Sequence, residues 1–240
     1  MDYLETLLLW PARLETFTLG DMNRFGFCRI NIASVWSALI PHMATLKSIR
    51  IGSVANQANW DIPPPDVLSG VSFTRFECLT FLSLSYWNTG YNTAYLPGLM
   101  APCLQTFEWT FDRTGVYLDM FQGPEEEFLY HLASTARQGG IPLRQIAIDY
   151  VPHAKMGREL FGGTRYQEAE LKYPWDCMIQ LKRLIHGLRI DLTYNQPTVT
   201  REEFEVALLE YKQANERGPE QEATDLEELE GGDSDESGSV

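Results

Sequence analysis

The chain has 240 residues, of which 44% are hydrophobic and 12% aromatic, so it is long enough to bury one sizeable core. Its formal net charge of -14 at pH 7 argues against nucleic acid or an anionic membrane surface as a partner, because both attract basic proteins. We therefore expect a globular domain that binds neither nucleic acid nor membrane.

The negative charge is concentrated at the C-terminal end. Residues 213–240 hold ten acidic residues and one arginine, a net charge of -9 that leaves -5 for the rest of the chain. Because this segment has little apolar surface to offset the entropy of ordering, we predict a disordered acidic tail over 218–240. Thr224, Ser234 and Ser237 suit an acid-directed kinase, but a solubilising tail is the interpretation we favour.

The four cysteines are too few and too dispersed for a disulfide-stabilised secreted fold. They are Cys28, Cys78, Cys103 and Cys177, and no two of them form a C-x-x-C pair. Residues 1–10 contain an apolar run but no basic residue, which is unlike a signal peptide, and nowhere do about 20 apolar residues follow one another. We expect an intracellular protein, cytoplasmic or nuclear, without a membrane span.

One apolar pattern recurs along the chain, with a lead residue followed by apolar residues at +3 and +5. Its six copies are Leu14/Phe17/Leu19, Leu46/Ile49/Ile51, Leu79/Leu82/Leu84, Leu104/Phe107/Trp109, Leu143/Ile146/Ile148 and Ile185/Leu188/Ile190. The spacing of two between the last apolar residues predicts a short strand in each copy. Prolines just upstream of four copies mark where the preceding connection ends.

Helices are predicted in several of the connections. The expected helices span 34–40 with Ser34 as N-cap, 124–138 with Pro124 in the first turn and Gly139 as the stop, 174–184, and 200–218 from the capping box Thr200–Glu203. The acidic residues Glu125–Glu127 are explained by the positive end of the helix dipole. The segment 61–66, with three consecutive prolines, is predicted to be a surface loop.

Parallel strands joined by helical crossovers fit two architectures, a leucine-rich-repeat-like solenoid or a general α/β domain. The repeated pattern favours an irregular α/β solenoid over residues 1–212, with one parallel strand per repeat and a C-terminal helix of about 200–217 as its cap. Two features argue against this assignment. The intervals between copies are long and uneven, and the Asn or Cys usual three residues after the third apolar position is missing from every copy.

Five segments resemble the repeat region of filamentous-fungal F-box proteins. They are LLLWPARLETFTLGD (7–21), WSALIPHMATLKSIRIG (36–52), CLTFLSLSYWNTG (78–90), LMAPCLQTFEWTF (99–111) and PLRQIAIDYVP (142–152). The resemblance covers about residues 4–155 and rests on the order of the segments and their Pro-His and Ala-Pro pairs. It implies a leucine-rich-repeat fold that captures the substrate of a cullin-RING ubiquitin ligase. Family members dock onto the Skp adaptor through an N-terminal F-box, and no F-box precedes Leu4 here.

No catalytic or phosphate-binding motif is present, so we expect no enzymatic activity, no cofactor and no metal site. One alternative is an α/β enzyme with a site assembled from residues such as Asp149, His153 and Cys177. Another is a truncated fragment without function. Cys78 and Cys103 each precede a lead leucine, and we expect both to be small buried packing residues rather than a metal or redox pair.

A protein-binding surface has the better physical basis. If the +3 and +5 residues point inward, those at +2, +4 and +6 line the opposite, concave face of the sheet. The predicted binding residues are Arg50, Phe81, Tyr86, Trp87, Glu108, Asp149 and Arg189. Arginine and aromatic side chains of this kind anchor many interfaces. We expect a monomer that binds an unidentified protein, and that binds the Skp adaptor only if an F-box is encoded upstream.

Overall fold

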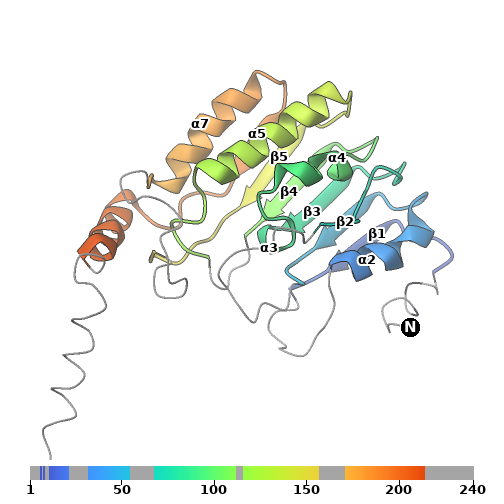
Figure 1. Cartoon of the computed structure of the whole chain (residues 1–240), viewed down its shortest axis with the longest axis horizontal. Helices are drawn as coiled ribbons and strands as arrows, with labels where there is room; N and C mark the ends of the chain where they lie inside the picture. Colours follow the sequence, from blue (N-terminus) through green and yellow to red (C-terminus); the bar gives the residue numbers. More distant parts are fainter. Residues whose placement is uncertain are drawn as a thin grey trace, which may run out of the picture.

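The computed structural model describes residues 6, 8, 11–21, 32–54, 68–111, 116–156 and 171–213. In this part of the chain six strands form one parallel sheet, and their spatial order follows the sequence from β1 to β6 (Figure 1). The strands are β1 (Thr16–Leu19), β2 (Ser48–Ile51), β3 (Phe81–Ser85), β4 (Thr106–Thr110), β5 (Gln145–Asp149) and β6 (Asp191–Tyr194). The prediction of an α/β architecture with parallel strands is confirmed.

Helices occupy most of the connections between strands. They are α2 (Ile32–Leu39) before β2, α3 (Tyr86–Thr89) and α4 (Leu96–Leu99) between β3 and β4, α5 (Gly123–Gln138) before β5 and α7 (Pro174–His186) before β6. The short turns η2 (Ile40–His42) and η3 (Thr93–Tyr95) follow α2 and precede α4, respectively. Helices α5 and α7 lie side by side (Figure 1), and a further helix over residues 201–213 follows β6.

The first five copies of the repeated pattern occupy equivalent places in the sheet. Their +3 residues are all buried and form one row across β1 to β5: Phe17, Ile49, Leu82, Phe107 and Ile146. The +5 residues form a second row on the same face, because alternate residues of a strand point to the same side. The helix layer packs on this face, as the contact between Trp109 of β4 and Phe128 of α5 shows.

The sixth copy was placed wrongly by the sequence pattern. Ile185 lies within α7 rather than at the entry to a strand, and the chain turns at Arg189, whose φ is 61°. Strand β6 therefore starts at Asp191, and Leu192 aligns with Ile146 in the buried row. The error arose because Ile185 in the last turn of α7 lies three residues before the apolar residue Leu188. This is the same spacing that separates a lead residue from the first apolar residue of its strand.

The amino ends of the strands repeat the same backbone hydrogen bonds. In each case the carbonyl after the lead leucine accepts two N–H groups of the next copy, at 2.8–3.1 Å. The accepting residues are Glu15, Lys47, Thr80 and Gln105, and the donor pairs are Lys47/Ser48, Thr80/Phe81, Gln105/Thr106 and Arg144/Gln145. This recurrence makes the backbone of the five copies equivalent before the strands begin, which fixes their common register.

Most of the predicted helix boundaries are confirmed. Helix α5 has Pro124 in its first turn and Gly139 as C-cap, and α7 begins at Pro174. Thr200 and Glu203 form both bonds of the predicted capping box, with distances of 2.7 and 3.2 Å. Ser34 was wrongly assigned as an N-cap, because α2 already begins at Ile32.

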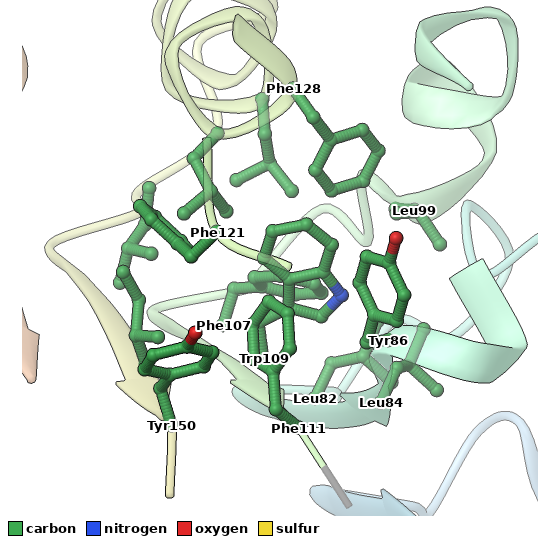
Figure 2. Packing of buried hydrophobic residues seen from close by; sticks show 14 of the residues in the cluster. Leu82, Leu84, Tyr86, Leu99, Phe107, Trp109, Phe111, Phe121, Phe128 and Tyr150 are labelled. Carbon is green, nitrogen blue, oxygen red and sulfur yellow. The ribbon is translucent and has the colours of Figure 1, made fainter. Parts of the chain in front are cut away.

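Aromatic side chains dominate the core beneath α5 (Figure 2). Phe111 contacts Tyr86, Trp109, Phe121 and Tyr150, with ring centroids 4.8–5.9 Å apart. Trp109 lies in β4, and the other rings come from segments that follow β3, β4 and β5, so the cluster ties the carboxyl ends of three strands to the helix layer. Aromatic pairs in such stacked and edge-on arrangements stabilise a core beyond the area they bury.

Some predictions concern parts of the chain that are not described. The proline-rich loop over 61–66, the acidic tail over 218–240 and Cys28 all lie outside the described residues. The division into a repeat domain and a tail likewise stays a prediction. Within the described ranges, no helix combines the length and apolar character needed to cross a bilayer.

Candidate functional site

The face of the sheet opposite the helices is the candidate site, and we call it the open face. Its central row, one residue from each strand, is Thr18, Arg50, Ser83, Glu108, Ala147 and Thr193. In β1, β2, β4 and β5 the residues of this face are exposed or half-buried, whereas the intervening +3 residues are buried. Within the described residues, this alternation shows that no second layer covers the open face.

Arg50 of β2 lies in the central row of the open face and connects three strands. Its Nη2 lies 3.0 Å from Oε2 of Glu108, and its guanidinium lies 5.4 Å from the ring centroid of Phe81. The register places Ser83 of β3 between Arg50 of β2 and Glu108 of β4. The ion pair therefore reaches across β3, which explains why Ser83 is only 1% exposed on a face without a second layer.

The ion pair leaves binding capacity on both of its partners. The Arg50 side chain is 49% exposed and that of Glu108 is 19% exposed. Oε2 of Glu108 is buried and lies 3.0 Å from Nη2 of Arg50, but it accepts no hydrogen bond of suitable geometry from the described residues. The guanidinium keeps further N–H donors for an incoming acceptor, and its stacking on Phe81 orients it.

Carboxylates dominate the half of the open face formed by β4, β5 and β6. Glu108, Asp149 and Asp191 lie on these three strands, and Asp191 has Lys182 of α7 at 3.7 Å. At the amino end of β1, Glu15 lies between Arg13 and Lys47, at 2.6 and 2.8 Å. The hydrogen bond from Lys47 and then the charges of Arg13 and Lys47 lower the pKa of Glu15. Paired cations thus occur at both edges of the sheet, beside Glu15 before β1 and beside Asp191 of β6.

The structure brings together three of the predicted binding residues, Arg50, Phe81 and Glu108. Asp149 lies one strand away from Glu108 on the same face and is exposed. Arg189, by contrast, was assigned wrongly to the central row. It lies in the turn before β6, and Thr193 takes the place in the row that had been given to it.

Tyr86 and Trp87 lie directly after their strand, as expected, but the prediction that they belong to an exposed binding surface is wrong. They are 0% and 1% exposed. Ser85 caps α3 by accepting a bond from the Trp87 N–H, so the chain turns into a helix directly after β3. Tyr86 then points into the core (Figure 2), where its hydroxyl donates to Oε1 of the buried Glu125 at 3.2 Å. The sequence pattern gave no indication of this turn.

Side chains with carboxamide or carboxylate groups link the carboxyl ends of neighbouring strands, and the sequence analysis missed them. Asn88 accepts from the Val54 N–H at 3.2 Å and donates to the Gly52 carbonyl at 2.6 Å. Asn195 makes the same two kinds of bond with Tyr150, at 2.8 and 2.6 Å. Leucine-rich repeats place an asparagine or cysteine three residues after the third apolar position, which is Trp87 in the third copy. Asn88 lies one residue beyond that position, so the pattern did not predict its role.

Asp149, His153 and Cys177 do not form one site. Cys177 lies in α7 and donates a hydrogen bond to Glu126 of α5, whereas Asp149 lies on the open face. Burial, and then the Glu126 carboxylate, raise the pKa of the Cys177 thiol well above its usual range, so it stays protonated at neutral pH. Burial also raises the pKa of Glu126. No cluster of three or more metal-ligating side chains occurs among the described residues.

Cys78 and Cys103 are both exposed, contrary to the expectation that they pack inside the fold. The adjacent lead residues Leu79 and Leu104 are fully buried instead. Each cysteine lies in a turn directly before its leucine, and adjacent residues of such a turn can point in different directions. The leucine is therefore buried while the cysteine beside it is exposed.

Comparison with known proteins gives no name for this architecture: no family model, no curated protein and no solved structure matches the chain.

Proposed function

We propose that this chain is a protein-binding module built as an irregular leucine-rich-repeat-like solenoid, and that the open face captures its partner. The observation that carries the proposal is the Arg50–Phe81–Glu108 cluster on a sheet face that no second layer covers within the described part of the chain. A half-exposed arginine held by an aromatic ring and a carboxylate is a ready anchor for an incoming polar segment.

Two features support the solenoid part of the proposal. The strands follow one another in sequence order, as they do when each repeat stacks on the preceding one. The backbone bonds at the amino ends of the strands recur between successive copies, and Asp21, Asn88 and Asn195 bind the backbone of a neighbouring copy after the strands. Such side chains substitute for the regular asparagine of leucine-rich repeats.

The resemblance of residues 4–155 to fungal F-box proteins suggests what the module does. On this proposal the open face takes the place of the substrate-capturing surface of a cullin-RING ubiquitin ligase, and the captured partner is an intracellular protein. The Skp adaptor would join only through an F-box encoded before Leu4. Reading the 5′ end of the native transcript tests this extension. If no F-box is encoded in frame upstream, the proposed role in a ubiquitin ligase is rejected, and only the proposal of a protein-binding module remains.

Site-specific photo-crosslinking tests the binding surface directly. A photoreactive amino acid replaces Thr106, which lies on the open face, or Arg137, which is exposed on α5. In extracts of the source cells we expect a discrete protein adduct from position 106 and none from position 137. Arg50→Glu should abolish the adduct, because it reverses the anchoring charge. Arg13→Glu, a control outside the strands with the same change in charge, should not.

The proposal is overturned if both positions capture the same proteins or if Arg50→Glu leaves the adduct from position 106 unchanged. Circular dichroism of each variant checks that the fold is retained. This control matters because Glu108 loses its partner in Arg50→Glu.

A further inference from the structure

Two exposed cysteines occupy the same position in two equivalent turns. The N–H of Leu79 donates to the Phe76 carbonyl at 3.2 Å, and the N–H of Leu104 donates to the Ala101 carbonyl at 3.1 Å. Each bond closes a four-residue turn, and the third residue of the turn is Cys78 in one case and Cys103 in the other. Both turns lead into a fully buried leucine and then into neighbouring strands.

The register brings these two turns side by side. The Thr80 carbonyl accepts from the N–H groups of Gln105 and Thr106, at 2.9 and 3.0 Å. Cys78 and Cys103 each lie two residues before this point of pairing, so they occupy equivalent positions in adjacent copies. A disulfide requires Cα atoms about 4.4–6.8 Å apart, a window that includes the spacing of about 5 Å between paired strands.

Packing does not explain these two residues. Both thiols are exposed and free, whereas Cys177 is buried and held as a thiol against Glu126. The cysteines lie in turns rather than in the hydrogen-bonded ladder, so their side chains can approach each other without breaking strand pairing.

We propose that Cys78 and Cys103 form a dithiol site that closes reversibly to a disulfide joining the third and fourth copies. The oxidant is a small disulfide of the glutathione class. The thiolate of one cysteine attacks the oxidant and releases one small thiol, leaving a mixed disulfide on the protein. The second thiolate attacks the protein sulfur of that mixed disulfide and releases the other small thiol. The two protein thiols are oxidised and the small disulfide is reduced to two thiols.

Mass spectrometry of the full chain tests this site. The background variant Cys28→Ser removes the cysteine that lies outside the described residues. After treatment with glutathione disulfide we expect the mass to fall by two hydrogen atoms, with no glutathione retained. Trypsin releases both cysteines in one peptide, residues 76–113, because no lysine or arginine lies between them. That peptide should resist alkylation until a reductant is added.

Matched variants separate a neighbouring pair from two independent thiols. Cys78→Ser and Cys103→Ser should each retain one glutathione adduct, since the resolving thiol is missing. Phenylarsine oxide, which bridges adjacent thiols, should bind the background variant in a 1:1 ratio and should lose tight binding in either single variant. Two stable glutathione adducts on the background variant, a disulfide between two chains, or arsenical binding unaffected by Cys103→Ser would each overturn the proposal.

Discussion

The guanidinium of Arg50 lies 3.0 Å from the carboxylate of Glu108, although the two residues belong to strands separated by β3. The pair covers Ser83 and connects β2, β3 and β4 on the open face. This ion pair contributes both to the stability of the sheet and to the candidate binding surface. Its effect on the free energy of unfolding must therefore be measured separately from its effect on partner binding.

Removing Arg50 should cost little stability but should expose the coupling to Glu108. We expect Arg50→Ala to lower the free energy of unfolding by about 1 kcal/mol or less, because the arginine is half exposed. A double-mutant cycle with Glu108→Gln, measured by urea denaturation, gives the coupling energy. Arg13→Ala, which removes a more exposed ion pair with Glu15, should have a smaller effect. A coupling energy of zero would show that the ion pair does not form in solution.

Asn88 should contribute more to stability than its polar character suggests. Its side chain is fully buried and satisfies both the Val54 N–H and the Gly52 carbonyl. Asn88→Ala leaves these backbone groups without partners, and we expect a loss of about 1–3 kcal/mol. Asn88→Asp keeps the acceptor but replaces the amide donor with a carboxylate oxygen against the Gly52 carbonyl in a fully buried position, so it should be at least as destabilising as Asn88→Ala. Equal stability of all three proteins in thermal melts would contradict this role.

Gly52 should not tolerate a side chain, whereas Gly20 should. A Cβ at position 52 would lie 2.9 Å from the backbone nitrogen of Asp21 and would also clash with the Asp21 carboxylate. No atom lies within 4 Å of a Cβ at position 20. We expect Gly52→Ala to cost about 1–3 kcal/mol by overpacking. Gly20→Ala should stay within about 0.5 kcal/mol of wild type. Similar midpoints for the two variants would show that β1 and β2 separate at this end.

The hydroxyl of Tyr86 should stabilise the core. It donates to the buried Glu125, whose other carboxylate oxygen caps the start of α5 by accepting from the Gln122 N–H. Tyr86→Phe removes a hydrogen bond to a buried carboxyl, with an expected loss of about 1–3 kcal/mol. Tyr130→Phe is the control, because Tyr130 is 40% exposed. If both variants melt together, Tyr86 does not point into the core.

Glu126 should make the protein less stable as pH rises. Burial raises its pKa above the ordinary value of 4.5, so the folded state holds the proton more tightly than the unfolded state. The stabilisation from this group is complete below pH 4.5 and is lost as pH rises through the folded pKa. Glu126→Gln should therefore raise the melting temperature at neutral pH, with a smaller gain under acid conditions.

Glu127→Gln is the matched control for the charge change in the first turns of α5, because the Glu127 side chain is 69% exposed. Subtracting its effect isolates the cost of burying Glu126. The same gain at every pH, or a gain no larger than that of Glu127→Gln, would show that the Glu126 carboxyl is solvated in the fold.

The sequence predicted the parts of the candidate site that depend on strand alternation. Arg50, Phe81 and Glu108 were assigned to the outward face because their buried neighbours follow a spacing of two, and they do come together. Tyr86 and Trp87 could not be placed in this way. The end of β3 is set by the Ser85 cap of α3, and the buried surroundings of Tyr86 are built by Trp109, Phe111 and Glu125 from later parts of the chain.

By itself, the sequence determined the parallel α/β class, five of the six strands, the limits of α5, the start of α7 and the capping box at Thr200. These features depend on local periodicity, on proline and glycine, and on side chains within one turn of the backbone they bind. The tertiary structure alone decided that β6 starts at Asp191, that Asn88 links two copies, that Tyr86 is buried and that Cys78 and Cys103 are exposed. Each of these follows from the register between segments far apart in the chain, and a spacing within one segment does not contain that register.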